Sequence, residues 1–431
     1  MTNNSNSKKK DSSKRRSNSS GGGFRSWGSK NRSESSSSSG SSSSGKSRSF
    51  GGRPRRRPMK KRDVKKFDPT LFIKKVEEQT ITPIYIPKNT FSDFAIEEQI
   101  KKNIAKKGYL APTKIQDETI PLILEGKDVI ATANTGTGKT AAFLIPLISN
   151  ILTKKANKVL IIAPTRELAS QIQDELHLFK EHTGLSSALC IGGSNLDFQI
   201  RKIKRNPAFI IGTPGRLIDL EERRFIDFGK FDAIVLDEVD TMLDMGFIQD
   251  VKHIISMLPK KRHSLFFSAT IPKKVKEIMD TFLKNPISIT VKTRESAENV
   301  NQDIIKIGNS NKIDVLHDLL IKPQFKKVII FSRTKRDTDK LSRALQERGF
   351  KVAVIHGDKT QGARKKALEQ FKNDKVHILL ATDVVARGID IDDVTHVINY
   401  DMPQTYEDYI HRIGRTGRAS KIGNAITFVT E

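Results

Sequence analysis

The 431-residue sequence contains a single cysteine, a single tryptophan and no long hydrophobic run. Cys190 has no partner for an internal disulfide, and no Cys/His cluster has the spacing of a zinc site. No apolar run approaches the roughly 18 residues that a membrane helix needs. The N-terminus is basic but lacks the apolar segment and cleavage pattern of a secretory signal. We therefore expect a protein of the reducing cytoplasm without a membrane span.

Acidic residues are also scarce, at 49 Asp and Glu against 76 Lys and Arg, which gives a net charge of +27. This balance predicts a polyanionic partner, with nucleic acid first and an anionic membrane surface second. Residues 1–66 carry 20 Lys and Arg against three acids, and are rich in Ser and Gly. This composition predicts a disordered tail. Phe24, Trp27 and Phe50 lie among Arg and Gly, which favours non-specific contact with unpaired bases over a purely solubilising tail.

Beyond the tail, residues 67–90 form a short pre-domain segment, where "FDPTLFIKKV" predicts a short capped helix. From Phe91 onward, short apolar runs alternate with helical stretches such as "RELASQIQDELHLFKEH" and "RDTDKLSRALQERG". This alternation predicts an α/β fold of parallel sheets with helices on both faces. The predicted strands are Asp128–Ala133, Val159–Ala163, Phe209–Gly212, Ala233–Leu236, Leu265–Phe267, Val328–Phe331, Val352–Ile355, His377–Ala381, His396–Asn399 and Ala425–Val429.

The alternation is interrupted once, by the polar stretch "VKTRESAENVNQD" from Val291 to Asp303. We interpret this stretch as a linker, so two domains are expected, at 91–290 and 304–431. In open parallel sheets, ligands bind beyond the carboxyl ends of the strands. The residues that follow each predicted strand are therefore the candidate site.

The first predicted strand leads into "ATANTGTGKT", which fits the phosphate-binding pattern G-x-x-x-x-G-K-[ST] with Ala133 in the first glycine place. A strand before the pattern and a helix after it favour a nucleotide site over an ordinary Gly-rich turn. Lys139 is expected to contact the β and γ phosphates, and Thr140 to offer its hydroxyl to Mg²⁺. The predicted phosphate loop comprises Ala133, Asn134, Thr135, Gly136, Thr137, Gly138, Lys139 and Thr140.

Another predicted strand ends in three carboxylates, within "IVLDEVDTMLDMGF". Asp237 is placed to hold Mg²⁺, most simply through water, and Glu238 to orient or deprotonate the attacking water. The competing interpretation is a helix cap, a role that Asp240 alone would fill.

The letters "DEVD" resemble the DEAD-box signature, and some ten motifs from Phe91 to Glu431 are similar in kind and order to those of the DEAD-box RNA helicases. The resemblance implies two RecA-like domains in tandem, ATP and Mg²⁺ as cofactors, and RNA bound through its backbone with little sequence specificity.

"GYLAPTKIQ" resembles the adenine-reading Q motif of that family, with Phe91 seventeen residues before Gly108. The resemblance implies that Gln116 bonds the adenine edge, that Phe91 or Tyr109 packs near the ring, and that Thr113 positions the loop. Such contacts favour ATP over GTP, because the wrong base would leave a buried amide unpaired.

Other motifs resemble the RNA-binding and coupling motifs of the family, although each by itself could be a turn with a cap. The implied coupling residues are Asp240, Ser268, Thr270 and Arg387. The implied RNA contacts are Pro164, Thr165, Arg166, Gly192, Gly193, Thr213, Pro214, Gly215, Arg216, Arg333, Thr382 and Gly388.

"YIHRIGRTGR" near the C-terminus has cationic or titratable groups alternating with Gly, which argues against a mere basic surface patch. By resemblance, Arg415 and Arg418 are arginine fingers that reach the γ-phosphate, His411 belongs to the same catalytic set, and Asp383 binds the ribose. A finger of this kind contributes about 10³–10⁵ in rate, which would make hydrolysis depend on domain closure.

The sequence departs from the family at Val239, which replaces Ala at a position without chemistry, and in "IIFSRT", where Ser332 and Arg333 leave the RNA contact less defined. The chain also stops directly after its last predicted strand. The predicted function is an ATP-dependent RNA helicase. The alternatives are a DNA-directed relative and a non-catalytic RNA clamp, and the presence of Lys139, Glu238 and both fingers counts against the clamp.

Overall fold

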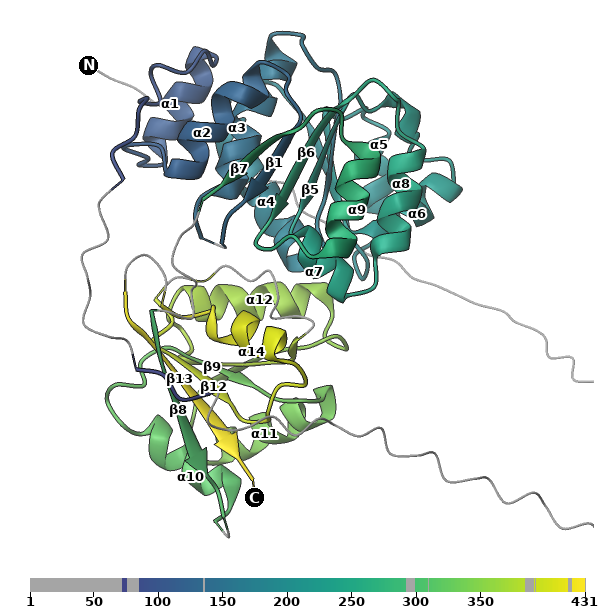
Figure 1. Ribbon diagram of the computed structural model, residues 1–431. Helices are drawn as coiled ribbons and strands as arrows, with labels where there is room; N and C mark the ends of the chain where they lie inside the picture. Colours follow the sequence, from purple (N-terminus) through teal and green to yellow (C-terminus); the bar gives the residue numbers. More distant parts are fainter. Residues whose placement is uncertain are drawn as a thin grey trace, which may run out of the picture. The chain divides into compact units, whose positions relative to one another are not determined.

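The computed structural model describes residues 72–75, 85–134, 136–291, 299–308, 310–383, 391, 393–417 and 421–430. Two parallel β-sheets with flanking helices make up this part of the chain, and each is described by itself (Figure 1). The predicted α/β fold class is thereby confirmed. The predicted disordered tail at 1–66 lies outside the described residues.

The first sheet has seven strands in the order β3-β4-β2-β5-β6-β1-β7, and every recorded pairing is parallel. Since the strands run in the same direction, all their carboxyl ends lie at one edge of the sheet. The strands are β1 Val129–Thr132, β2 Val159–Ile162, β3 Ser187–Cys190, β4 Phe209–Gly212, β5 Ala233–Asp237, β6 His263–Ser268 and β7 Ile287–Thr290.

Two apolar clusters cover the faces of this sheet, one formed with α1 to α4 and the other with α5 to α9. Successive strand residues belong to opposite clusters: Ile161 packs with the first, Leu160 and Ile162 with the second. The helices are α1 Glu98–Lys106, α2 Lys114–Leu124, α3 Lys139–Leu152, α4 Arg166–Phe179, α5 Leu196–Ile203, α6 Pro214–Glu222, α7 Val239–Asp244, α8 Ile248–Ser256 and α9 Lys273–Phe282, with a short 3-10 turn at Phe228–Lys230.

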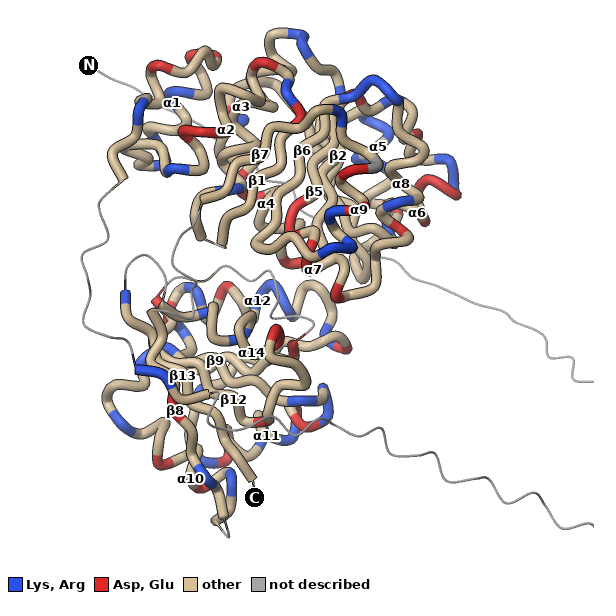
Figure 2. Tube along the Cα trace, in the orientation of Figure 1, with Lys and Arg blue, Asp and Glu red and all other residues tan. Residues whose placement is uncertain are grey.

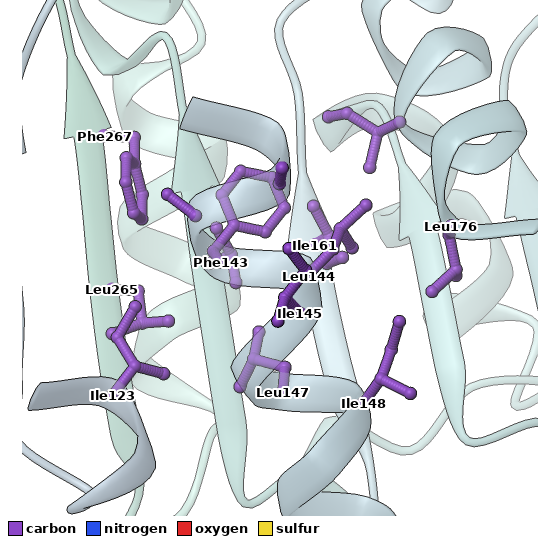
Figure 3. Packing of buried hydrophobic residues seen from close by; sticks show 14 of the residues in the cluster. Ile123, Phe143, Leu144, Ile145, Leu147, Ile148, Ile161, Leu176, Leu265 and Phe267 are labelled. Atoms are coloured by element: carbon purple, nitrogen blue, oxygen red, sulfur yellow. The ribbon is translucent and has the colours of Figure 1, made fainter. Parts of the chain in front are cut away.

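Helix α3 is almost wholly buried, which is unusual for the flank of a sheet and explains its nearly continuous apolar sequence. Phe143 packs on Phe267 of β6 with ring centroids 5.1 Å apart, and Figure 3 shows the helix between strand residues such as Leu265 and Ile161. Because α3 begins at Lys139, this packing fixes the helix end that follows the phosphate loop.

The second sheet has six strands in the order β10-β11-β9-β12-β13-β8, again parallel in every recorded pairing. Helices α12 and α14 pack with one set of strand residues, and α10 and α11 with the other. The elements are β8 Val300–Lys306, α10 Lys312–Leu320, β9 Val328–Phe331, α11 Lys335–Glu347, β10 Val352–Ile355, α12 Gln361–Lys372, β11 Ile378–Ala381, β12 His396–Asn399, α14 Tyr406–Ile413 and β13 Gly423–Val429.

Each apolar run predicted as a strand overlaps a strand of the structure, whereas β3, β7 and β8 were not predicted. All three are edge strands, which bury less side-chain surface and so lack a continuous apolar run. Strand β8 begins at Val300, inside the stretch 291–303 that the sequence suggested as a linker. The predicted helix in "FDPTLFIKKV" is wrong where it is described: Phe72 lies in a 3-10 turn, and Lys74 forms an antiparallel bridge with Gln302.

Candidate nucleotide and nucleic-acid site

The motifs of the first sheet lie along its carboxyl edge in two groups. The phosphate loop follows β1, Ser268 ends β6, and the carboxylates follow β5, so these three occupy neighbouring strands. The loops after β2, β4 and β3 carry the groups expected to contact RNA, on the other half of the edge. The topology therefore separates a nucleotide half from an RNA half, and the carboxylates at the end of β5 lie between them.

The phosphate loop is shaped by two glycines in the left-handed region, Gly136 with φ of 84° and Gly138 with φ of 93°. Lys139 is buried, and its ammonium donates to the carbonyl of Ala133 at 2.9 Å, across the loop. Thr140 lies in the first turn of α3. The loop thus places a cation, a hydroxyl and the N-terminus of a helix together, which is a suitable arrangement for an anion.

The Q-motif residues contact this loop directly. The Thr113 hydroxyl donates to the Thr137 carbonyl at 2.8 Å, and Gln116 Nε2 donates to the Gly138 carbonyl at 3.2 Å. Gln116 Oε1 accepts from the Thr113 backbone N–H at 2.9 Å, which completes a capping box at the start of α2. The predicted role of Thr113 in positioning the loop agrees with these contacts, and the adenine contact of Gln116 stays a prediction.

Phe91 and the Q-motif residue Tyr109 are parts of an aromatic cluster. The Phe91 ring is buried, with its centroid 6.1 Å from that of Phe94 and 6.2 Å from that of Tyr109. Tyr109 also packs edge-on against Phe179 of α4. In this structure Phe91 belongs to the core, while Leu110, next to Tyr109, is 96% exposed.

Asp237 and Glu238 are both buried at the end of β5, where Figure 2 shows acidic positions gathered beside α7. Burial raises the pKa of Asp237 to about 7, because Lys139 offsets only part of the desolvation and the nearby Glu238 and Asp240 add to it. Glu238 has φ of 53°, a left-handed conformation that is strained for a residue with a side chain. Strain and a perturbed carboxyl at one strand end are typical of a functional site.

Asp240 connects this strand end with the loop after β6. Its Oδ2 accepts from the backbone N–H of Ala269 at 3.1 Å, and from both the N–H and the hydroxyl of Thr270, at 2.8 and 3.0 Å. Its own N–H donates to Ser268 Oγ at 3.3 Å. Asp240, Ser268 and Thr270, which the resemblance grouped as coupling residues, are in direct contact in the structure.

On the RNA half, Arg166 brings two motifs together. A Cβ added at Gly193 would lie 2.4 Å from Arg166 Nη1, and one at Gly192 would lie 3.1 Å from Nη2. The guanidinium therefore covers the turn that follows β3, and Gly193 has φ of 75°. Thr165 caps α4 by accepting from the Leu168 N–H at 3.2 Å, and Pro164 precedes it. The close approach explains why glycines stand at 192 and 193.

The loop after β4 begins α6, with Thr213 at the N-cap and Pro214 in the first turn. Gly215 has open space around its Cα, since an added Cβ would meet nothing within 4 Å. Arg216 pairs with Asp219 at 3.3 Å. The Thr213 N–H donates to the Cys190 carbonyl at 3.1 Å, which ties this loop to the end of β3.

In the second sheet, Asp383 follows β11 and is held by Arg412 of α14. Arg412 Nε and Nη2 donate to the two carboxylate oxygens of Asp383 at 2.5 and 2.8 Å, and Nη1 donates to Asn399 Oδ1 and to the Asp401 carbonyl. Arg412 is 2% exposed. Arg412 belongs to the cationic motif "YIHRIGRTGR", and the structure shows it as a buried arginine that fixes Asp383. The ribose contact of Asp383 stays a prediction.

Arg415 is also buried, and its Nε donates to the His411 carbonyl at 3.1 Å. Arg333 is exposed, with its backbone N–H bonded to Asp401 Oδ2 at 2.9 Å, and Thr382 follows β11 half-buried. Four predicted site residues lie outside the described part of the chain: Thr135, Arg387, Gly388 and Arg418.

The sequence did not indicate one buried acid beside the site, Asp117. Its carboxylate accepts from the Tyr85 hydroxyl, from the Lys88 N–H at 2.7 Å, and from the Asn89 side chain at 2.7 Å. Burial by itself would raise the pKa of Asp117, but these hydrogen bonds lower it overall. Asp117 thus holds the segment before Phe91 against α2. In the sequence, only its position directly after Gln116 of the Q motif pointed to this residue.

Among the described residues, no group of three or more His, Cys, Asp or Glu side chains is arranged to hold a metal ion. Magnesium sites in nucleotide-binding proteins use only one or two carboxylates, with water and phosphate oxygens as the other ligands. No helix within the described ranges is long and apolar enough to cross a membrane.

Fold and site together define a class of protein, a nucleotide-binding protein with two parallel-sheet domains and a second group of loops suited to a polyanion. Comparison with known families supports this. Residues 113–278 match the DEAD/DEAH box helicase family, and residues 311–420 match the helicase conserved C-terminal domain.

The chain is 48% identical over 341 residues to the ATP-dependent RNA helicase CshA of Listeria monocytogenes, and covers 66% of that relative's length with 79% of its own. It is 46% identical over 343 residues to the DEAD-box ATP-dependent RNA helicase CshA of Bacillus subtilis. That alignment covers 79% of this chain and 69% of the relative. The structure of S. cerevisiae Dbp5 bound to RNA and ADP BeF3 matches with a TM-score of 0.70 at 31% identity, over 79% of this chain and 90% of that chain.

The chain therefore belongs to the DEAD-box family of ATP-dependent RNA helicases, and its two sheets are RecA-like domains. The family and its enzyme class, which the resemblance of the motifs implied, are confirmed at this level.

Proposed function

We propose that this chain hydrolyses ATP in response to RNA and opens short RNA duplexes locally. One observation carries the proposal: Asp240, between the nucleotide and RNA halves of one sheet edge, is bonded to the loop that follows β6. A hydrogen-bonded carboxylate at this place links the strand end that bears Asp237 and Glu238 to a neighbouring loop. Hydrolysis at that strand end can therefore shift the loop that follows β6.

The proposed ATP site uses Lys139 for the β and γ phosphates and Glu238 for the attacking water. Thr140 and Asp237 would hold Mg²⁺, and oxygen donors of this kind fit its preference. The raised pKa of Asp237 supports this assignment, because a buried carboxyl gains from a cation that offsets its desolvation. Mg²⁺ would supply the charge that neutralises the phosphate oxygens. Phe91, Tyr109 and Gln116 are proposed to border the adenine.

We further propose that two domains, one at 91–290 and a second that includes β8 from Val300 and runs to 431, close around ATP and RNA. Closure would bring Arg415, Arg418 and His411 to the γ-phosphate, with Asp383 at the ribose and Arg387 relaying the movement. The loops around Arg166, Gly193 and Arg216 would bind the RNA backbone, which carries no sequence information. The basic tail would add non-specific contacts, and ATP and RNA as substrates favour a cytoplasmic location.

The test is the ATPase rate of the full chain alone, with single-stranded RNA, and with DNA of the same sequence. We expect RNA to stimulate the rate and DNA not to do so. In the Glu238→Gln variant we expect the rate to fall by about 10²–10⁴ while RNA binding persists. A chain that binds RNA without stimulation would be a clamp, and equal stimulation by DNA would indicate a DNA-directed enzyme.

A further inference from the structure

A short segment that precedes the first domain in sequence pairs with the edge strand of the second sheet. The Lys74 N–H donates to the Gln302 carbonyl at 3.0 Å, and the Gln302 N–H donates to the Lys74 carbonyl at 2.7 Å. This antiparallel bridge lies on β8, at the end of an otherwise parallel sheet (Figure 1). We name residues Phe72–Lys75 the strap. It covers part of an edge that would otherwise present unpaired backbone groups.

The strap places one aromatic side chain in the core of the second sheet. Phe72 is fully buried in a cluster with Val300, Tyr409, Ile413 and Ala425, and its ring centroid lies 4.5 Å from that of Tyr409. The side chain of Ile73, one position along, is 51% exposed. Lys74 and Lys75 are exposed as well, so Phe72 is the one buried side chain of the strap and serves as its anchor.

The elements that contact the strap are joined to one another. The Tyr409 hydroxyl donates to Gln302 Oε1 at 2.9 Å, and it is the backbone of Gln302 that pairs with Lys74. Burial raises the pKa of Tyr409, so its hydroxyl stays protonated and donates. Strap, β8 and α14 therefore form one packed and hydrogen-bonded unit.

This unit continues into the loop that carries Arg415. A Cβ added at Gly417 would lie 2.8 Å from Val300 Cγ2 and 2.9 Å from the Asn299 carbonyl, so the loop rests on the start of β8. The Thr416 hydroxyl donates to the Val394 carbonyl on the other side. Val300 thus contacts the arginine loop and belongs to the same buried cluster as Phe72.

We propose that Phe72 is a positioning residue for the arginine motif: the strap braces β8 and α14 and so holds Arg415 where it can act. The proposal rests on the proposed ATPase function. Phe72 itself touches none of the reacting groups and acts through Val300, Tyr409 and Ile413. A shift of about 1 Å in a catalytic group is enough to cost about 10²-fold in rate, so a modest loosening of α14 has a measurable effect.

The first test is the steady-state ATPase of the full-length Phe72→Ala variant with saturating RNA. We expect kcat to fall about tenfold with KM for ATP within about twofold, because a group acting in the transition state affects kcat. Phe72→Leu should restore most of the rate. Ile73→Ala changes an exposed neighbour in the same strap and should match the parent. A folded Phe72→Ala variant with parental kcat would overturn the proposal.

A second pair of variants covers the case in which Phe72→Ala does not fold. Lys74→Pro removes the N–H of the bridge, whereas Lys74→Ala keeps it and changes only an exposed side chain. We expect a lower kcat in Lys74→Pro and the parental kcat in Lys74→Ala. Equal rates would refute the proposed positioning by the strap.

Hydrogen exchange of the full chain separates this proposal from the ATPase function on which it rests. In Lys74→Pro, amides of β8 and α14 should exchange faster while those of α3 stay protected. Faster exchange in a chain without RNA-stimulated ATPase would refute the function alone. Unchanged amide exchange in β8 and α14 of an active Lys74→Pro variant would refute only the proposed positioning by the strap.

Discussion

The carboxylate of Asp240 accepts two hydrogen bonds from Thr270, one from its backbone N–H at 2.8 Å and one from its hydroxyl at 3.0 Å. The two residues follow neighbouring strands of one sheet, β5 and β6. The bond therefore joins the strand end that bears Asp237 and Glu238 to the loop that follows β6.

Removing the hydroxyl of this pair tests the proposed coupling. In Thr270→Val we expect ATP hydrolysis within about threefold of the parent and duplex opening reduced about tenfold, since about 1.4 kcal/mol of coupling is lost. The measurement is strand displacement of a short RNA duplex beside ATPase in the same buffer. Thr270→Ser keeps the hydroxyl and should behave as the parent. Parallel losses of both activities would contradict a coupling role.

The pKa of Asp237 gives a pH-dependent prediction for the protein without nucleotide. Burial raises this pKa to about 7 from an ordinary 3.8, so the folded state binds more protons than the unfolded state between these values. The free energy of unfolding therefore falls as pH rises from about 4 to about 7. Asp237→Asn should lessen this decline and raise the unfolding temperature at pH 8 by about 2–4 °C, for about 1 kcal/mol gained.

Thermal unfolding at pH 5 and pH 8, without Mg²⁺ and nucleotide, measures this effect. The gain should be small at pH 5, where the carboxyl of the parent is already protonated. ATP hydrolysis by the variant should be lost at both pH values. An equal gain at the two pH values would show that Asp237 titrates normally.

Gly138 and Gly136 allow a matched comparison within the phosphate loop. Both have positive φ, but a Cβ at Gly138 would lie 2.4 Å from Gln116 Nε2, whereas one at Gly136 would meet nothing within 4 Å. Backbone strain alone costs about 1–2 kcal/mol, so Gly136→Ala should weaken binding of a fluorescent ATP analogue by about tenfold. Gly138→Ala should weaken it further. Equal affinities of the two variants would contradict the observed contact with the Q motif.

Asp117 is predicted to stabilise the first domain above its own pKa. Its four side-chain and backbone donors lower that pKa, so the stabilisation is present above the unfolded value of 3.8 and is lost as pH falls through the folded value. Asp117→Ala leaves buried donors unpaired and should cost about 1–3 kcal/mol at pH 7 in urea unfolding. The difference from the parent should shrink toward pH 3. Tyr85→Phe, which removes one donor, should cost less than Asp117→Ala.

The basic tail offers a prediction that depends on charge alone. Deleting residues 1–66 removes 20 Lys and Arg. RNA affinity should fall, and the slope of log affinity against log salt concentration should become shallower, because fewer counterions are released on binding. Basal ATPase should not change. Fluorescence titrations at several salt concentrations measure this, and an unaltered slope would exclude a binding role for the tail.

The sequence alone was enough for the motifs whose chemistry is local. A phosphate loop needs glycines and a lysine at fixed spacing, here Gly136, Gly138 and Lys139. A buried strand is recognised as a short apolar run such as Ile234–Leu236. For that reason the family, the α/β class and the order of the motifs were predictable. The edge strands β3, β7 and β8 were not, because they lack a continuous apolar run, as Asn301 and Gln302 show in β8.

Tertiary structure decided which side chains serve as supports. Arg412 and Arg415 are three positions apart in one cationic motif, yet only packing shows that Arg412 is engaged by Asp383, Asn399 and Asp401. Likewise, the local sequence "FDPTLFIKK" does not indicate that Phe72 packs in a buried cluster of the second sheet. The other residues of that cluster lie more than two hundred positions later. Burial and pairing of this kind depend on long-range contacts, which a local pattern does not encode.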